Sequence, residues 1–248
     1  WLILEPTVAT SSGGATLTKQ SDGSFLASGK NPKFDTYKFT ARTDLRSLTA
    51  IRVEALADSS MKKSGPGRAP NGNFDLTHVS VVARPVSGTG SQITLVLKNP
   101  QATFEQGANL SVVMAIDEDR KSGWAIDPQF GQDQAAVFDT SEDIGFDGGT
   151  EFEFQLEFKG NDQHNFGRTR LSISTAPRPA KIEIGGDLLA IQDAFASIGE
   201  KPIAEANESQ RKLLLDWYKP RDELRSALTE TVDKHAATKP KPTLVKML

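Results

Sequence analysis

Two loops of this sequence carry residue types that could bind a ligand. The first, 64–74, reads SGPGRAPNGNF and presents Arg68, Asn71 and Asn73 between three glycines and two prolines. Glycine and proline restrict the shape of such a loop, so a guanidinium and two amides are held ready for a hydroxyl-rich or anionic ligand. The alternative is that the same polar groups satisfy buried backbone groups of the loop itself.

The second loop, 122–127, contains Trp124 beside a turn. A tryptophan ring in this position can stack on the face of a sugar, or it can cap the hydrophobic core. We take Arg68, Asn71, Asn73 and Trp124 as the candidate ligand-binding residues.

A third loop has residues suited to a hard metal ion. Asp117 and Asp119 lie two positions apart in a loop that ends at Gly123, and their carboxylates could bind Ca²⁺. The loop departs from an EF-hand because its glycine is one place late and Pro128 occupies the twelfth position. A solvated turn is the alternative, and calcium is the one cofactor that we consider for this chain.

The sequence offers little for catalysis. The absence of cysteine excludes disulfides, iron–sulfur ligation, attachment of haem c and a cysteine nucleophile within the chain. His78, His164 and His235 stand at no metal-ligand spacing, and no Gly-x-Ser-x-Gly motif is present. Two carboxylates for glycoside hydrolysis need only meet in space, so a carbohydrate-active enzyme stays the third alternative.

Composition narrows the classes of partner. The chain has 248 residues, a net charge of -3 and a mean hydropathy of -0.39, which gives no electrostatic case for nucleic acid. No apolar run approaches the roughly 20 residues of a membrane helix, so we expect no membrane insertion. The chain begins at Trp1, and its last residues, 242–248, resemble the start of another element. We therefore expect a fragment of a larger protein.

Most of the chain has the pattern of short strands. Apolar and polar residues alternate most clearly in 150–158, where Phe152, Phe154, Leu156 and Phe158 share one face. Further strands are expected at 36–42, 48–56, 79–84, 93–97, 102–104, 136–138 and 168–175, with turn-rich segments between them. The pattern predicts an antiparallel β-sandwich over residues 1–183.

The remainder, 184–248, predicts a helical extension and a linker to a following domain. Leu188, Ile191 and Phe195 recur at helical spacing, and Asn207 can cap a second helix. Pro220 should end that helix, and a third is expected from 221 to about 235.

A series of motifs in the strand-rich part resembles a known family. In order, these are 22–32 (DGSFLASGKNP), 35–37, 48–54 (LTAIRVE), 65–74, 115–117, 122–126, 136–138 and 164–173 (HNFGRTRLSI). The series resembles the β-rich module of the large planctomycete cytochrome c domain proteins. The layout is also similar to discoidin and galactose-binding-like jelly rolls, and this resemblance implies an antiparallel jelly-roll β-sandwich for residues 1–183. Gln134 and Lys246 depart from the family pattern, which has histidine in the segment around 134 and a Thr-Met-Val-Met-like stretch at the C-terminal end.

The resemblance implies a function and a location. It implies a module without haem of its own, inside a larger protein that carries haem c in another domain. Because haem c is attached outside the cytoplasm, it implies an exported chain in the periplasm or at the cell surface. We expect a non-catalytic binding module for a glycan that also contacts other domains of the same protein; the alternative is a structural spacer without a ligand.

Overall fold

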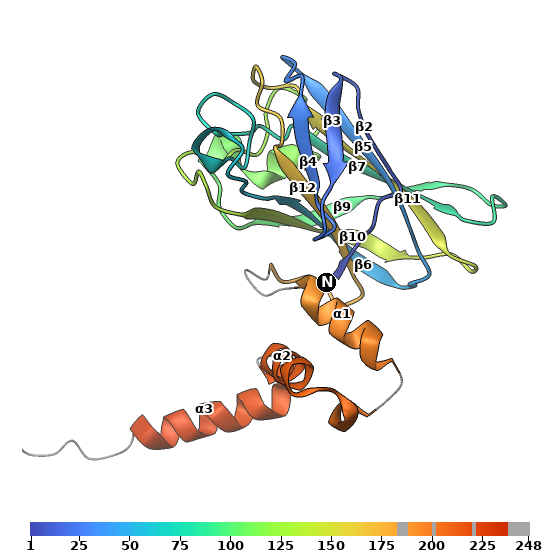
Figure 1. Ribbon diagram of the computed structural model, residues 1–248, viewed down its shortest axis with the longest axis vertical. Coiled ribbons are helices and arrows are strands. Elements are labelled where there is room, and N and C mark those ends of the chain that lie inside the picture. The colour runs from blue at the N-terminus through green and yellow to red at the C-terminus, as the bar shows by residue number, and fades with distance from the viewer. Residues whose placement is uncertain (183–187, 200–201, 220–221, 238–248) are drawn as a thin grey trace, which may run out of the picture. The chain divides into compact units, whose positions relative to one another are not determined.

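The computed structural model describes residues 1–182, 188–199, 202–219 and 222–237 (Figure 1). The chain divides into two compact units, Trp1–Gly185 and Gly186–Leu248. The helix end expected at Pro220 and the element expected at 242–248 lie outside the described residues.

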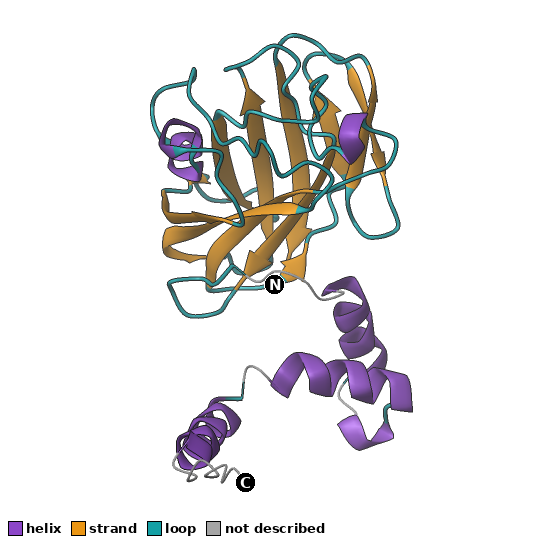
Figure 2. Ribbon diagram, turned by 90° about the vertical axis from the view of Figure 1, so that its left-hand side faces the viewer, coloured by secondary structure: helices purple, strands orange, loops and turns teal. Residues whose placement is uncertain are grey.

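The first unit is an antiparallel β-sandwich, which confirms the predicted fold class (Figure 2). One sheet has the order β3-β4-β12-β6-β10-β9, with β1 also paired to β12; the other has the order β2-β5-β11-β7-β8. The strands are β1 Leu2–Ile3, β2 Val8–Ser11, β3 Ala15–Lys19, β4 Phe25–Gly29, β5 Asp35–Thr43, β6 Leu48–Ala55, β7 His78–Pro85, β8 Ile93–Thr94, β9 Leu97–Ala102, β10 Gln134–Ile144, β11 Thr150–Phe158 and β12 Arg168–Ser174. Short 3₁₀ helices lie at Lys62–Ser64, Ala108–Leu110 and Val112–Ile116.

The core lies between the two sheets. On β11, the four residues expected to face inward, Phe152, Phe154, Leu156 and Phe158, are at most 1 % exposed. Ile51 and Val53 of β6 enter the same core from the other sheet, so Arg52 and Glu54 point to that sheet's outer face. The central strands of the two sheets therefore bury their inner faces against each other, as the alternation predicts.

The first four strands were not expected from the sequence. Strands β1 to β4 lie within the first 29 residues, and β2 and β3 have no fully buried residue. Threonine, serine and alanine make up most of β2 and β3, so the alternation of large apolar with polar residues that marks β11 is weak there. The strand expected at 93–97 is in fact two, because β8 and β9 pair in different sheets.

Part of the outer face of the seven-stranded sheet is also apolar. Ala50 of β6 and Val137 of β10 pack there with Ala180, and Trp1 and Ile182 lie against them. The Trp1 Nε1 group donates to the carbonyl of Lys181 at 3.4 Å. The first and last described residues of the sandwich thus meet on one sheet.

The second unit contains helices α1 Leu188–Ile198, α2 Glu208–Tyr218 and α3 Glu223–Ala237, with a 3₁₀ turn at Ile203–Glu205. Asn207 caps α2 as predicted, because its side chain accepts from the Gln210 N–H and the Gln210 side chain accepts from the Asn207 N–H. Ile191, Ala194 and Leu214 form a small core between α1 and α2. Among the described residues, no helix has the length and apolar character to cross a membrane.

We predict that deleting residues 186–248 leaves the sandwich folded. The residues of its core cluster run from Leu4 to Ile173, so the deletion removes none of them. Circular dichroism should keep its strand signature, and urea unfolding should stay cooperative. Loss of cooperative unfolding in the shortened chain would show that the helices complete the core.

Candidate functional site

The loop 64–74 is shaped by close backbone approach. Gly67 donates its N–H to the carbonyl of Gly72 at 3.0 Å, and a Cβ at Gly67 would collide with the main chain of Asn73. The loop is fixed to its neighbours as well, since the Arg68 N–H donates to the Asn165 carbonyl at 2.9 Å. These contacts define the shape of the loop, and its rigidity stays a prediction from its composition.

Arg68 uses its guanidinium inside the protein. Nη1 donates to the carbonyl of Lys30 at 2.7 Å, and Nη2 donates to the carbonyl of Gly29 at 2.9 Å. These bonds tie the loop to the end of β4. Arg68 is half-buried, and the contacts favour the structural alternative for it.

The two asparagines are engaged in the same way. Asn71 Oδ1 accepts from the N–H of Asn73 at 3.1 Å. The Asn73 side chain donates to Gln106 Oε1 at 3.0 Å and accepts from the N–H of Ile126 at 3.0 Å. Asn73 thus joins three loops, and a ligand role for Asn71 and Asn73 stays a prediction.

Trp124 lies wholly in the core. Its exposed fraction is 0 %, its ring packs edge-to-face on Phe74 and Phe166, and its Nε1 donates to the Phe104 carbonyl at 2.8 Å. No face of the ring is open to a ligand, which does not fit the stacking role considered from the sequence. The position matches the alternative, a tryptophan that caps the core.

The loop with Asp117 and Asp119 forms a turn capped by its own carboxylates. Asp117 Oδ1 accepts from the N–H of Asp119, and Asp119 Oδ1 accepts from the N–H of Lys121, both at 2.9 Å. In the part of the chain that the structure describes, no three carboxylate or imidazole side chains come together as metal ligands. Calcium at Asp117 and Asp119 stays a prediction.

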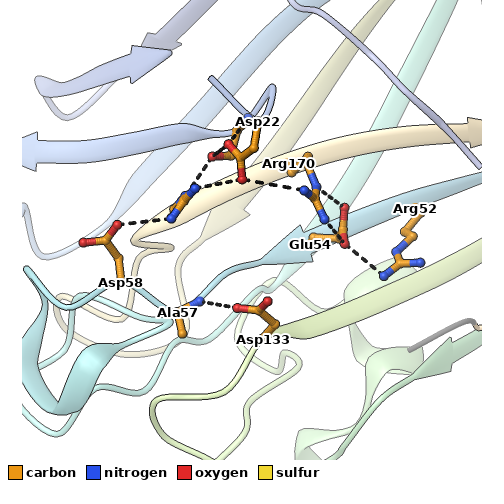
Figure 3. Close-up of polar contacts among 9 residues, drawn as sticks. Asp22, Arg52, Glu54, Ala57, Asp58, Asp133 and Arg170 are labelled. Atoms are coloured by element: carbon orange, nitrogen blue, oxygen red, sulfur yellow. Dashed lines mark hydrogen bonds and ion pairs between the residues drawn. The ribbon is translucent and has the colours of Figure 1, made fainter. Parts of the chain in front are cut away.

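The outer face of the seven-stranded sheet holds a cluster that the sequence analysis did not single out (Figure 3). We call it the arginine–carboxylate network, and its members are Asp22, Arg52, Glu54, Asp58, Arg168 and Arg170. The register sets Arg170 of β12 directly opposite Glu54 of β6. Alternating charges in 51–54 and 168–170 were the available signal, but only strand pairing shows that they meet.

Every residue of the network forms a salt bridge with another member. Arg170 binds both oxygens of Glu54, at 2.8 and 3.0 Å, and lies 3.6 Å from Asp22 (Figure 3). Arg52 reaches Glu54 at 2.9 Å. Arg168 pairs with Asp22 at 2.7 Å and with Asp58 at 3.3 Å.

The network contains a buried part and an accessible part. The side chains of Glu54 and Arg52 are 3 % and 7 % exposed, whereas those of Arg168 and Asp22 are 23 % and 29 % exposed. Deep ion pairs of this kind are costly to break, because removal of one partner leaves the other charge buried. The accessible side chains can contact a ligand, and the buried side chains hold the accessible ones in position.

The carboxylates at the accessible end stay ionised. Burial opposes ionisation of Asp22, but hydrogen bonds from Ser24 and the charges of Arg168 and Arg170 lower its pKa. Hydrogen bonds from Ser60, and then the charge of Arg168, lower the pKa of Asp58. Because both pKa values fall below those of the unfolded chain, the network stabilises the protein at neutral pH and loses this effect as the pH falls through them.

An aromatic ring, that of Phe130, lies on a loop that is hydrogen-bonded to Ala57, the residue before Asp58 of the network. Phe130 is half-buried, and the ammonium of Lys63 stands 4.5 Å from its ring centroid. The loop of Phe130 is tied to the loop of Lys63, since Gly131 donates to the carbonyl of Gly65 at 2.8 Å. The same loop is bonded to a second segment, because the Asp133 carboxylate accepts from the N–H of Ala57 at 2.8 Å (Figure 3).

The comparisons with known proteins show a weak structural likeness. No protein-family model matches the sequence, and no curated protein matches it. A solved structure described as "Xyl-CBM35 in complex with glucuronic acid containing disaccharide" aligns with 74 % of this chain and 100 % of its own, at 12 % identity and a TM-score of 0.34. A TM-score this low does not establish a common fold between the two proteins.

We predict that Arg68→Ala lowers the free energy of unfolding by about 1–2 kcal/mol, since the carbonyls of Gly29 and Lys30 lose their donors. Urea unfolding measures the change. Lys33→Ala is the control, because its pairing with Asp162 is exposed and should contribute under about 1 kcal/mol. Equal stability of the two variants would contradict a structural role for Arg68.

We predict a larger loss for Glu54→Ala, about 3 kcal/mol, because Arg52 and Arg170 would lose a buried partner. Glu151→Ala is the matched control on the other sheet, where Arg42 and Arg84 are more exposed and a loss under about 1 kcal/mol is expected. If the two glutamate variants unfold at the same urea concentration, the network is not a source of stability.

Proposed function

We propose that this chain is a non-catalytic carbohydrate-binding module whose ligand binds at the accessible end of the arginine–carboxylate network. One observation carries the proposal: Asp22, Asp58 and Arg168 are partly exposed on a sheet face and are already held by their neighbours. Ordering such side chains on binding would otherwise cost free energy.

The chemistry of these groups suits sugar hydroxyls. An ionised carboxylate accepts hydrogen bonds and a guanidinium donates them, so a neighbouring pair can serve hydroxyls that act in both ways. The partly exposed Phe130 adds an aromatic surface on an adjoining loop. A few fixed polar groups beside an aromatic ring are typical of small-ligand sites.

The same groups favour binding over hydrolysis. Glycoside hydrolysis requires a carboxyl that is protonated near neutral pH and can donate to the leaving oxygen. The lowered pKa values of Asp22 and Asp58 keep both as acceptors. Burial raises the pKa of Asp75 to about 6, but this residue is 2 % exposed and offers no surface to a substrate.

The spacer alternative has support of its own. The side chains of Arg68 and Asn73 in the loop 64–74 bond to neighbouring loops, and Trp124 bonds to the Phe104 carbonyl, which supports structural roles for these residues. An exported location, haem c elsewhere in a larger protein and contacts with its other domains stay predictions from the resemblance.

An array of neutral and acidic oligosaccharides tests the proposal on the isolated chain. The oligosaccharide with the strongest signal is then titrated calorimetrically against wild type, Asp58→Ala and Phe130→Ala. Each substitution should weaken binding about tenfold, which corresponds to the loss of roughly one hydrogen bond or contact.

Glu151→Ala, on the outer face of the other sheet, is the control and should bind as wild type does. Melting curves confirm that each variant is folded. A folded chain that binds no oligosaccharide on the array would favour the spacer. Binding that survives both substitutions would move the site away from the network.

A further inference from the structure

Asp75 is a buried acid with few partners. It is 2 % exposed, and its Oδ2 accepts from Asn161 Nδ2 at 3.1 Å. Its Oδ1 is buried and accepts no hydrogen bond from any residue that the structure describes. A buried carboxylate with one donor is costly when ionised, so this group requires an explanation.

Two glycines make room for the Asp75 carboxylate. A Cβ at Gly123 would collide with Oδ1, and a Cβ at Gly160 would collide with Oδ2. The carboxylate therefore lies against the main chains of two loops, which we call the 117–123 loop and the 159–164 loop. Asp75 also donates its N–H to the carbonyl of His164 at 2.9 Å, which fixes its own backbone to the second loop.

The charges around Asp75 do not compensate for its burial. From the 159–164 loop, the neighbours are the amide of Asn161 and the imidazole of His164, whose charge favours the carboxylate. The 117–123 loop contacts Asp75 through the main chain of Gly123, and the carbonyl of Lys121 lies close to Gly160 of the other loop. Burial is the largest effect, and it raises the pKa of Asp75 to about 6.

We propose that Asp75 is a proton-controlled clasp, which holds the 117–123 and 159–164 loops together when protonated and lets them separate when it ionises. The neutral carboxyl fits between the two glycines without a counter-charge. The ionised carboxylate needs water, and water can reach it only if the glycine-lined walls move apart. A pH change of one or two units near pH 6 would thus alter the order of this end of the sandwich.

The direction of the pH effect follows from linkage. The folded-state pKa lies above the unfolded value, so the stabilisation is complete below about pH 4 and is lost as the pH rises through about 6. The lowered pKa values of Asp22 and Asp58 act in the opposite sense and at lower pH. Their effect is common to all variants and cancels in a comparison between them.

Asp75→Asn tests the clasp, because the amide keeps the shape of the carboxyl and removes its titration. Melting temperatures are measured from pH 4.5 to 7.5 in wild type, Asp75→Asn and Asp162→Asn. Asp162 is an exposed acid of the same loop and serves as the control. Wild type should melt several degrees below Asp75→Asn at pH 7.5 and approach it at pH 4.5, and Asp162→Asn should follow wild type.

Amide hydrogen exchange of the wild-type protein gives a second measurement that does not depend on the variant folding. Exchange in 121–124 and 160–164 should rise between pH 5 and 7 by about tenfold more than in peptides of the same sequences, as local opening predicts. A melting difference between wild type and Asp75→Asn that is constant with pH would overturn the clasp. Exchange in these segments that only follows the peptides would overturn it as well.

Discussion

The packing of three aromatic rings positions the polar groups at the loop end of the sandwich. Phe74, Trp124 and Phe166 come from three different loops, and Phe74 lies 4.9 Å from Trp124 and 4.6 Å from Phe166, ring centre to ring centre. All three are 0 % exposed. Asp75 directly follows the first ring, and Arg168 stands two residues after the third. The positions of Asp75 and of Arg168 therefore depend on the packing of these three rings, although neither side chain takes part in it.

Local patterns in the sequence determine a good part of this fold. The alternation in 150–158 identifies β11 and its inward face because one side of that strand is wholly buried. Asn207 is recognisable as a helix cap because its partner, Gln210, lies three residues away. Where burial is shallow, as in β2 and β3, the same reasoning finds no strand.

The candidate site depends on pairings that sequence alone does not contain. Glu54 and Arg170 are 116 residues apart and become neighbours only through the register of β6 and β12. Arg68 is the opposite case, because its residue type suits a ligand but its guanidinium donates to the carbonyls of Gly29 and Lys30. Residue types indicate which chemistry is available, and long-range pairing decides whether it faces a ligand or the protein.

The contact between Trp1 and Lys181 has a mechanical consequence. Trp1 and Ile182 pack on the same patch of one sheet, so the two ends of the described part of the sandwich lie close together. A tension applied along the chain would act across that patch, on Trp1, Ala180 and Ile182, before it reached the core between the sheets.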